Sequence, residues 1–266
     1  MIATTPAAGF LRLLLIDAAT AALLFALVWR ICVRVGNYGF LDATWTFGIG
    51  LLATIDAIAG TGNAARRAAF TVVGLAWSLR LGVFILKRVL RHHPTEDKRY
   101  RSLRERWPSP GAFLAFFELQ ALIAVVFSAP FLFAAFAGNP RMRGAEWFGL
   151  ALAVVGIIGE AAADGQAESF KRRPRAQTTV LDTGLWRYSR HPNYFFEWLV
   201  WLGLAIAAFP LPLGGFAIVC PVLIAYFLLR VTGIPLTEKH SLETHGEAYR
   251  EYQRMTSAFI PWVRRR

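Results

Sequence analysis

Polar residues gather in one short stretch of this chain, directly before a long apolar run. Residues 185–197 read Leu-Trp-Arg-Tyr-Ser-Arg-His-Pro-Asn-Tyr-Phe-Phe-Glu. Next to hydrocarbon an unsatisfied polar atom costs several kcal/mol, so these side chains must face a water-filled cavity, a partner or a ligand. The alternative is a cytoplasmic loop whose arginines only anchor to lipid headgroups, but such a loop does not need His191, Asn193 or Glu197.

Pro192 predicts where the next helix begins. Its ring disfavours a helical conformation at His191 and suits the first turn of a helix, so a helix should begin at Pro192 or Asn193. The first N–H groups of a helix are unpaired and carry partial positive charge. With Arg187 and Arg190 beside them, they predict a site for a phosphate group.

A second polar set lies near the end of the apolar run at residues 146–169. Glu160, Asp164, Glu168 and Lys171 are spaced four, four and three apart, which places them on one helical face. Carboxylates on a helix that enters a bilayer indicate a functional site by default. A solvated helix end is the alternative.

A third set is dispersed over three further apolar runs. An arginine inside a span needs a carboxylate partner, and the candidates for Arg80 are Asp42 and Glu118. A purely structural ion pair is the alternative. The set as a whole is Asp42, Trp45, Trp77, Arg80, Glu118 and Gln120.

We predict no metal or redox site. His92 and His93 are adjacent, so their rings diverge on a helix, and His240 and His245 are five apart rather than the three or four that share a face. The two cysteines, Cys32 and Cys220, are too far apart in the sequence to form a C-x-x-C pattern. The sequence has no G-x-G-x-x-G or P-loop motif, so a nucleotide would need a site of another kind.

The composition is that of an integral membrane protein. Of 266 residues, 56% are hydrophobic, above the roughly 45–50% of soluble domains. Seven runs pass a spanning test of about 20 mostly apolar residues. The second run contains Asp42 and Asp56 and could be re-entrant. The runs are residues 10–31, 39–60, 68–90, 112–137, 146–169, 193–209 and 212–232.

Lys and Arg concentrate on one side of these seven spans, which explains the net charge of +12 without a nucleic-acid partner. The asymmetry places the N-terminus outside and the C-terminus in the cytoplasm. After the last span, residues 237–255 have the pattern of a polar helix, either on the surface or as a lid. Phe259-Ile-Pro-Trp262 then forms an aromatic cluster suited to the membrane interface. We therefore expect an all-α polytopic fold with seven transmembrane helices and a cytoplasmic C-terminal helix.

The chain resembles the bacterial membrane proteins called domain of unknown function 1295, which belong with the steroid 5α-reductases. The central match is residues 184–197, preceded by Glu160-x-x-x-Asp164-x-Gln166. Upstream matches are Asp42-Ala-Thr-Trp45, Trp77-Ser-Leu-Arg-Leu81 and Glu96-Asp-Lys-Arg-Tyr100, and downstream matches are Gly233-Ile-Pro, Glu238-Lys, Tyr249-x-x-Tyr252 and Phe259-Ile-Pro.

The resemblance implies an enzyme of the bacterial inner membrane that holds NADPH at the cytoplasmic side. Its relatives reduce a carbon–carbon double bond conjugated to a ketone in a lipophilic substrate such as a steroid. In one domain, residues 1–140 would form the substrate side and residues 141–266 the cofactor side. Carried over by position, the cofactor-binding residues would be Glu160, Asp164, Gln166, Lys171, Arg187, Tyr188, Arg190, His191, Asn193, Tyr194, Glu197, Arg230, Glu238, Tyr249 and Tyr252.

The substrate side departs from the pattern of the steroid reductases, which place a glutamate in the second helix and a tyrosine in the third. Here Trp77 stands at the tyrosine position and Asp42 lies one residue from the glutamate position. Because tryptophan has no phenolic proton, the ketone would be held by a protonated carboxyl group of Asp42 or Glu118, or by Tyr38 or water, near Arg80.

Two other functions stay open. Isoprenylcysteine carboxyl methyltransferases share the Arg-His-Pro-x-Tyr stretch and resemble this fold, but they use S-adenosylmethionine. A lipid-binding protein without enzymatic activity would bind no nucleotide. Reduction is favoured by Asn193, by Glu160 with Asp164, and by seven cations suited to the phosphates of NADPH: Lys171, Arg172, Arg173, Arg175, Arg187, Arg190 and Arg230.

Overall fold

The computed structural model describes residues 6–172 and 179–264, and within these residues the chain is helical apart from turns, extended connections and one isolated bridge between Ser189 and Ser257. The predicted all-α class is therefore confirmed. Six helical stretches of the described chain are long and apolar enough to cross a membrane: Ala7–Val35, Phe40–Ala59, Ala64–His92, Pro110–Phe136, Gly144–Lys171 and Gly214–Met255. They make this an integral membrane protein.

The count of seven spans is not confirmed. The sixth predicted run, residues 193–209, forms α7 (Pro192–Ala208), whose 17 residues extend only about 26 Å. That length is below the roughly 30 Å of a hydrocarbon core. The weak second run is one continuous helix, α2 (Phe40–Ala59). The side of the membrane on which each terminus lies stays a prediction.

The chain divides into two compact units, which we describe separately. Unit 1 contains Met1–Gly144 and Ala208–Ala217, and unit 2 contains Ala145–Ala207 and Ile218–Arg266. It stays a prediction that residues 1–140 form the substrate side and residues 141–266 the cofactor side. The single domain also stays a prediction.

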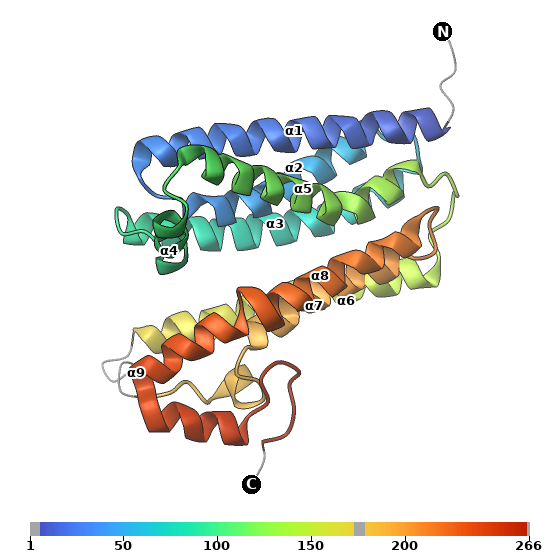
Figure 1. Ribbon diagram of the computed structural model, residues 1–266. Helices are drawn as coiled ribbons and strands as arrows, with labels where there is room; N and C mark the ends of the chain where they lie inside the picture. The colour runs from blue at the N-terminus through green and yellow to red at the C-terminus, as the bar shows by residue number, and fades with distance from the viewer. Residues whose placement is uncertain (1–5, 173–178, 265–266) are drawn as a thin grey trace. The chain divides into compact units, whose positions relative to one another are not determined.

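Unit 1 is a bundle of long helices. In Figure 1, α4 lies at the end of this bundle where α1 and α3 finish and where α2 and α5 begin. Contact between α2 and α3 is close because Gly50 has no side chain: a Cβ there would lie 2.3 Å from Ser78 Oγ, which donates to the Thr46 carbonyl at 2.9 Å. The helices of unit 1 are α1 (Pro6–Val35), α2, α3 (Ala64–His92), α4 (Lys98–Arg106) and α5 (Pro110–Phe136).

Unit 2 is built on the antiparallel pair α6 (Gly144–Lys171) and α7. Small residues allow the two backbones to approach: a Cβ on Gly149 would lie 2.3 Å from the Ala207 nitrogen, and a Cβ on Gly203 would lie 2.5 Å from the Ala153 nitrogen. The other elements of unit 2 are the turn η1 (Gly184–Arg187), α8 (Val219–Tyr226), the π-helical η3 (Phe227–Val231) and α9 (Ile234–Met255). The turn η2 (Gly214–Ile218), which precedes α8, belongs mostly to unit 1. Gly246, at φ 52°, kinks α9.

The glycine at position 149 yields the first prediction. Gly149→Ala places a methyl group against the backbone of α7, so α6 and α7 must separate and the melting temperature in detergent should fall by several degrees. Gly165→Ala in the same helix meets nothing within 4 Å and should leave the melting temperature equal or slightly higher, because alanine favours the helix. Equal stability of the two variants would contradict the close packing.

Candidate functional site

The polar stretch at residues 184–191 runs from η1 into the start of α7. The helix begins at Pro192, as predicted. Gly184 has a φ of 61°, and a Cβ on it would lie 2.5 Å from Gln166 Oε1, so glycine permits this close approach to α6. The same oxygen of Gln166 accepts the Leu185 N–H at 2.9 Å, and the indole of Trp186 donates to the Ala163 carbonyl at 3.1 Å. The stretch is therefore anchored on α6.

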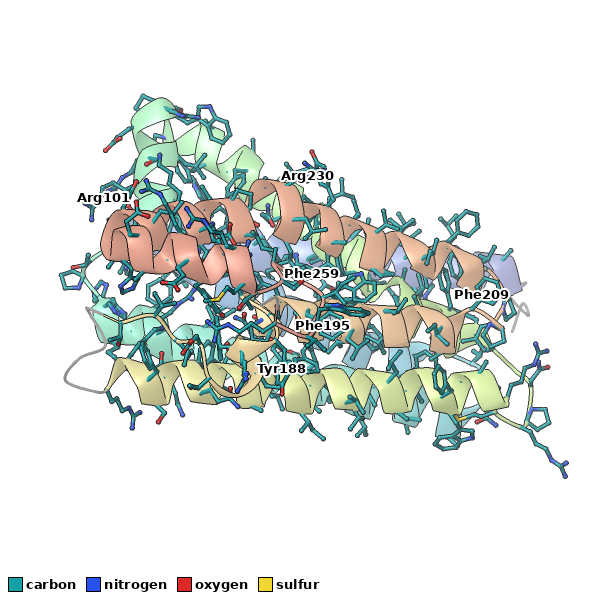
Figure 2. All side chains as sticks on the ribbon, turned by 90° about the horizontal axis from the view of Figure 1, so that it is seen from below. Arg101, Tyr188, Phe195, Phe209, Arg230 and Phe259 are labelled. Atoms are coloured by element: carbon teal, nitrogen blue, oxygen red, sulfur yellow. The ribbon has the colours of Figure 1, made fainter. Side chains whose placement is uncertain are left out.

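The C-terminal tail, residues 256–264, lies along this stretch. Arg190 N–H donates to the Ser257 carbonyl at 2.8 Å, and Trp262 N–H donates to the Tyr188 carbonyl at 2.9 Å. Ser189 Oγ donates to the Phe259 carbonyl at 2.8 Å. The ring of Phe259 packs on Phe195 of α7, with centroids 5.9 Å apart (Figure 2). The tail is therefore a structural partner of the polar stretch.

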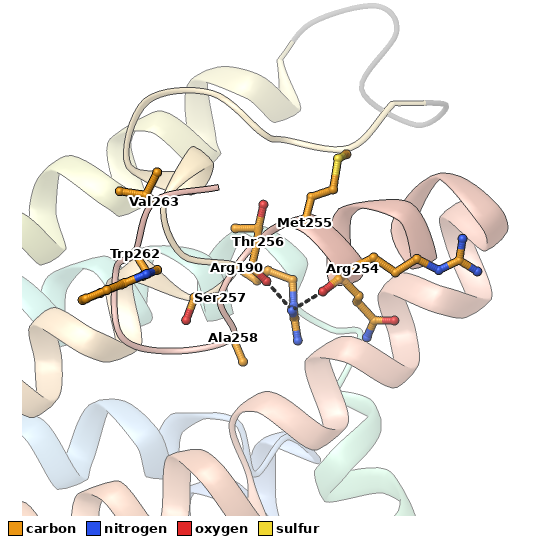
Figure 3. A pocket seen from close by; sticks show the side chains of 9 residues that line it. Arg190, Arg254, Met255, Thr256, Ser257, Ala258, Trp262 and Val263 are labelled. Atoms are coloured by element: carbon orange, nitrogen blue, oxygen red, sulfur yellow. Dashed lines mark hydrogen bonds between the residues drawn. The ribbon is translucent and has the colours of Figure 1, made fainter. Parts of the chain in front are cut away.

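Arg190 joins the stretch to α9 and the tail. Its Nε donates to Glu238 Oε1 at 2.7 Å, and its Nη1 donates to the carbonyls of Gln253 at 3.0 Å and Thr256 at 2.6 Å (Figure 3). Gln253 Nε2 donates to the other oxygen of Glu238 at 2.9 Å. Only 10% of the Arg190 side chain is exposed. The phosphate contact predicted for Arg190 stays a prediction, because the contacts observed bind the protein to itself.

His191 lies beside this network and is buried. Its Nε2 lies 3.3 Å from Glu238 Oε1, and its ring stacks on Tyr194 with centroids 5.3 Å apart. The hydroxyl of Tyr194 bonds to Thr237 Oγ1 at 3.1 Å. Burial lowers the pKa of His191 more than its hydrogen bond to Glu238 raises it. The imidazole is therefore neutral near pH 7 and donates to Glu238.

The facing sides of α6 and α7 carry a buried polar group. Asn193 Nδ2 donates to Asp164 Oδ1 at 3.2 Å, and Trp201 Nε1 donates to Glu197 Oε1 at 3.0 Å. Glu160, Asp164 and Glu197 are all buried. Because a carboxylate only accepts, Asn193 must present its amide nitrogen to Asp164. Its Oδ1 is then buried with no donor among the described residues.

The predicted cofactor residues outside this group differ in exposure. Lys171, Arg187 and Arg230 are exposed, and Lys171 Nζ lies 3.4 Å from Glu168 Oε1. Tyr249 and Tyr252 are buried at the base of α9, where the Tyr252 hydroxyl donates to the carbonyls of Trp186 and Ser189. Arg172 is exposed. Two of the seven predicted cations, Arg173 and Arg175, lie outside the described residues.

In unit 1, Asp42 has partners that the sequence reasoning did not name. Its carboxylate accepts from Arg99 Nη2 at 2.8 Å and from the Tyr100 hydroxyl at 2.5 Å. Arg99 also bonds to Asp97, which caps α4. These bonds hold α4 on the first turn of α2. Arg99 and Tyr100 lie in the segment Glu96–Tyr100 that matches the family pattern. That match is the one feature of the sequence that singles them out.

The remaining candidate catalytic residues also belong to unit 1. The guanidinium of Arg80 is 5.6 Å from the centre of the Phe84 ring. Tyr38 is buried, stacks on Phe113 with centroids 4.2 Å apart, and burial raises its pKa. Glu118 is partly exposed on α5. Arg99 and Tyr100 already engage the carboxyl group of Asp42, and its expected role toward a substrate ketone stays a prediction.

Geometry and composition together define a membrane protein with two helical units and a buried polar group at the start of α7. Residues 28–256 match the family described as "Protein of unknown function (DUF1295)", so the chain belongs to that family. It is also 28% identical over 216 residues to "Uncharacterized protein C594.04c" of Schizosaccharomyces pombe, an alignment that covers 70% of this chain and 60% of the relative. No solved structure matches.

Glu238 provides a prediction for the buried network. Glu238→Ala leaves the Arg190 charge buried beside carbonyls alone, which should lower the free energy of unfolding by roughly 3–5 kcal/mol. Glu247→Ala removes an equivalent ion pair on the same helix whose carboxylate side chain is 76% exposed, and it should cost about 0–1 kcal/mol. Thermal unfolding followed by tryptophan fluorescence compares the two. A loss no greater for Glu238→Ala than for Glu247→Ala would contradict the role of Arg190.

His191 predicts how stability depends on pH. The pKa of His191 is lowered in the folded protein, so the unfolded chain binds a proton first as the pH falls through about 6.5. Below that pH the folded state loses stability until its own His191 titrates. In melting scans, His191→Gln should flatten this acid-side decline. His240→Gln, at a side chain that is 65% exposed, should keep the wild-type slope, and an unchanged slope in both variants would refute the assignment.

Proposed function

We propose that this protein is an NADPH-dependent reductase of a conjugated carbon–carbon double bond in a lipophilic enone, related to the steroid 5α-reductases. The observation that carries the proposal is the Asn193 amide at the start of α7, which is held by Asp164 and whose buried acceptor oxygen has no donor among the described residues. Such an acceptor suits the carboxamide N–H₂ of a nicotinamide ring.

The rest of unit 2 fits the charge of this cofactor. NADPH carries a pyrophosphate and a 2′-phosphate, whereas S-adenosylmethionine carries a sulfonium and little net charge. Arg187 is exposed in the turn just before α7, Lys171 is exposed at the end of α6, and Arg230 is exposed at the end of η3. Exposed guanidinium and ammonium groups are the donors that phosphates favour. We assign the phosphate contacts to these three residues, because Arg190 is bound to Glu238 and to two carbonyls.

NADPH supplies a hydride when it is bound, and this hydride would reach the β-carbon of the enone. The chain's part is to fix the ring and to manage the proton. Asp164 orients Asn193, and Trp201 orients Glu197, so the polar groups of the site are held before the cofactor arrives. The proton that follows at the α-carbon needs an acid.

Glu118 is our choice for that acid. Asp42 already accepts bonds from Arg99 and Tyr100, so its oxygens are occupied by partners inside the protein. Glu118 lies within a span and is partly exposed. With Trp77 where steroid reductases have tyrosine, the ketone would be held differently, so we propose a lipophilic enone as substrate and leave its ring system open.

Nucleotide binding tests the proposal directly. NADPH should raise the melting temperature of the detergent-purified protein, because a ligand at about 100 times its dissociation constant contributes about 2.7 kcal/mol. S-adenosylmethionine at the same concentration should not. NADH, which lacks the 2′-phosphate, should stabilise less than NADPH.

Two arginine variants refine this experiment. Arg187→Ala should weaken NADPH binding by about 10- to 150-fold, the equivalent of roughly 1.5–3 kcal/mol for a charge-assisted contact, without changing the melting temperature of the free protein. Arg250→Ala, at an exposed residue paired with Glu247 on α9, is the control and should bind NADPH normally. Stabilisation by S-adenosylmethionine alone would favour a methyltransferase, and no stabilisation by either compound would favour a lipid-binding protein.

A further inference from the structure

The C-terminal tail exposes large apolar side chains, although it lies outside the helices that could cross a membrane. Ile260, Trp262 and Val263 are 58%, 70% and 75% exposed. Phe259, which the sequence placed in the same interfacial cluster, turns inward, where its ring lies 5.9 Å from Phe195 and 6.0 Å from Trp198. The tail is thus anchored by one aromatic ring and exposes three apolar neighbours.

This exposure belongs to a fixed segment. Trp262 N–H donates to the Tyr188 carbonyl at 2.9 Å, and the Arg264 guanidinium lies 3.1 Å from Asp182. Tyr188 is itself 47% exposed, so the backbone bond joins a second aromatic residue to the group. We name Tyr188, Ile260, Trp262 and Val263 the tail patch. Figure 3 shows Trp262 and Val263 on the segment that passes Arg190.

The place of the tail patch in the fold and its residue types are those of a membrane interface. The tail patch lies on the stretch that leads into α7 four residues after Tyr188, so it sits at the level where the apolar helix begins. Trp and Tyr are enriched at this level in membrane proteins because their rings are apolar and their N–H and O–H groups are polar. Arg254, just before the tail, is exposed, and arginine suits the phosphates of lipid headgroups.

The same unit exposes an apolar stripe on a helical stretch that could cross a membrane. Val222, Tyr226 and Leu229 are 60%, 55% and 38% exposed at helical spacing along α8 and η3, and Leu236 follows at 43% on α9. This stripe belongs to the stretch that is apolar enough to cross a membrane. The unit that carries the tail patch therefore also has a helical face suited to lipid.

We propose that the tail patch docks into the interface of the lipid bilayer and so holds the tail against the polar stretch at residues 184–191. The bilayer interface offers an apolar boundary for Ile260 and Val263. Its headgroups can accept from the indole N–H of Trp262 and pair with Arg254. Because Arg190 bonds to carbonyls at Gln253 and Thr256, docking of the tail also steadies that network. The proposal does not depend on the nucleotide.

An environment-sensitive probe tests the docking. Cys32 and Cys220 are both fully buried, so a cysteine introduced at an exposed position can be labelled selectively with a nitrobenzoxadiazole fluorophore. Val263→Cys is the test variant. Glu247→Cys, at a side chain that is 76% exposed on the polar helix α9, is the matched control. Both proteins are reconstituted in phosphatidylcholine nanodiscs, with or without lipids that carry a nitroxide near the headgroup.

The label at position 263 should emit at shorter wavelength than the label at position 247, and the nitroxide lipids should quench most of its emission while leaving the control nearly unchanged. Ile260→Cys should behave like Val263→Cys, which guards against a local effect of one substitution. Equal quenching at positions 263 and 247, or none at either 260 or 263, would overturn the proposal. Emission that depends on protein concentration but not on nitroxide would assign the patch to a second copy of the chain instead.

Discussion

The organisation of unit 2 depends on the hydrogen bonds of one group, the guanidinium of Arg190. It lies close to the carboxylate of Glu238 and to the carbonyls at the end of α9, and almost all of its side chain is buried. A buried charge of this kind is tolerated only when it is fully bonded, and removal of one partner leaves a large desolvation cost. The polar stretch, α9 and the tail therefore form one structure around a single side chain.

This arrangement explains why so many polar residues can sit beside an apolar helix. The glycines of α6 and α7 bring the two backbones together, and that approach places Asp164 next to Asn193. Within α7, the indole of Trp201 meets Glu197 one helical turn away. Each polar atom that finds a partner inside the protein no longer has to be solvated. The unfilled oxygen of Asn193 stands out for this reason, and it is the feature that points to a ligand.

In unit 1, a predicted catalytic residue also holds two helices together. Asp42 was predicted to hold the substrate because it is a carboxylate in an apolar run. Its bonds to Arg99 and Tyr100 fasten a short basic helix to the end of the bundle, and Glu96 adds a second tie by accepting the Tyr38 N–H at 2.9 Å and pairing with Arg104.

The sequence by itself determined the membrane character, the all-helical class and the start of α7 at Pro192, because apolar length and proline geometry act locally. Helical spacing also placed Glu160 with Asp164 on one face and Asn193 with Glu197 on another, and the family resemblance implied that all four line one site. Only the tertiary structure decided the partners of the charged residues: Arg190 meets a glutamate 48 positions away, and Asp42 meets an arginine 57 positions away. Which of several carboxylates an arginine reaches depends on how distant helices pack, and no local rule contains that information.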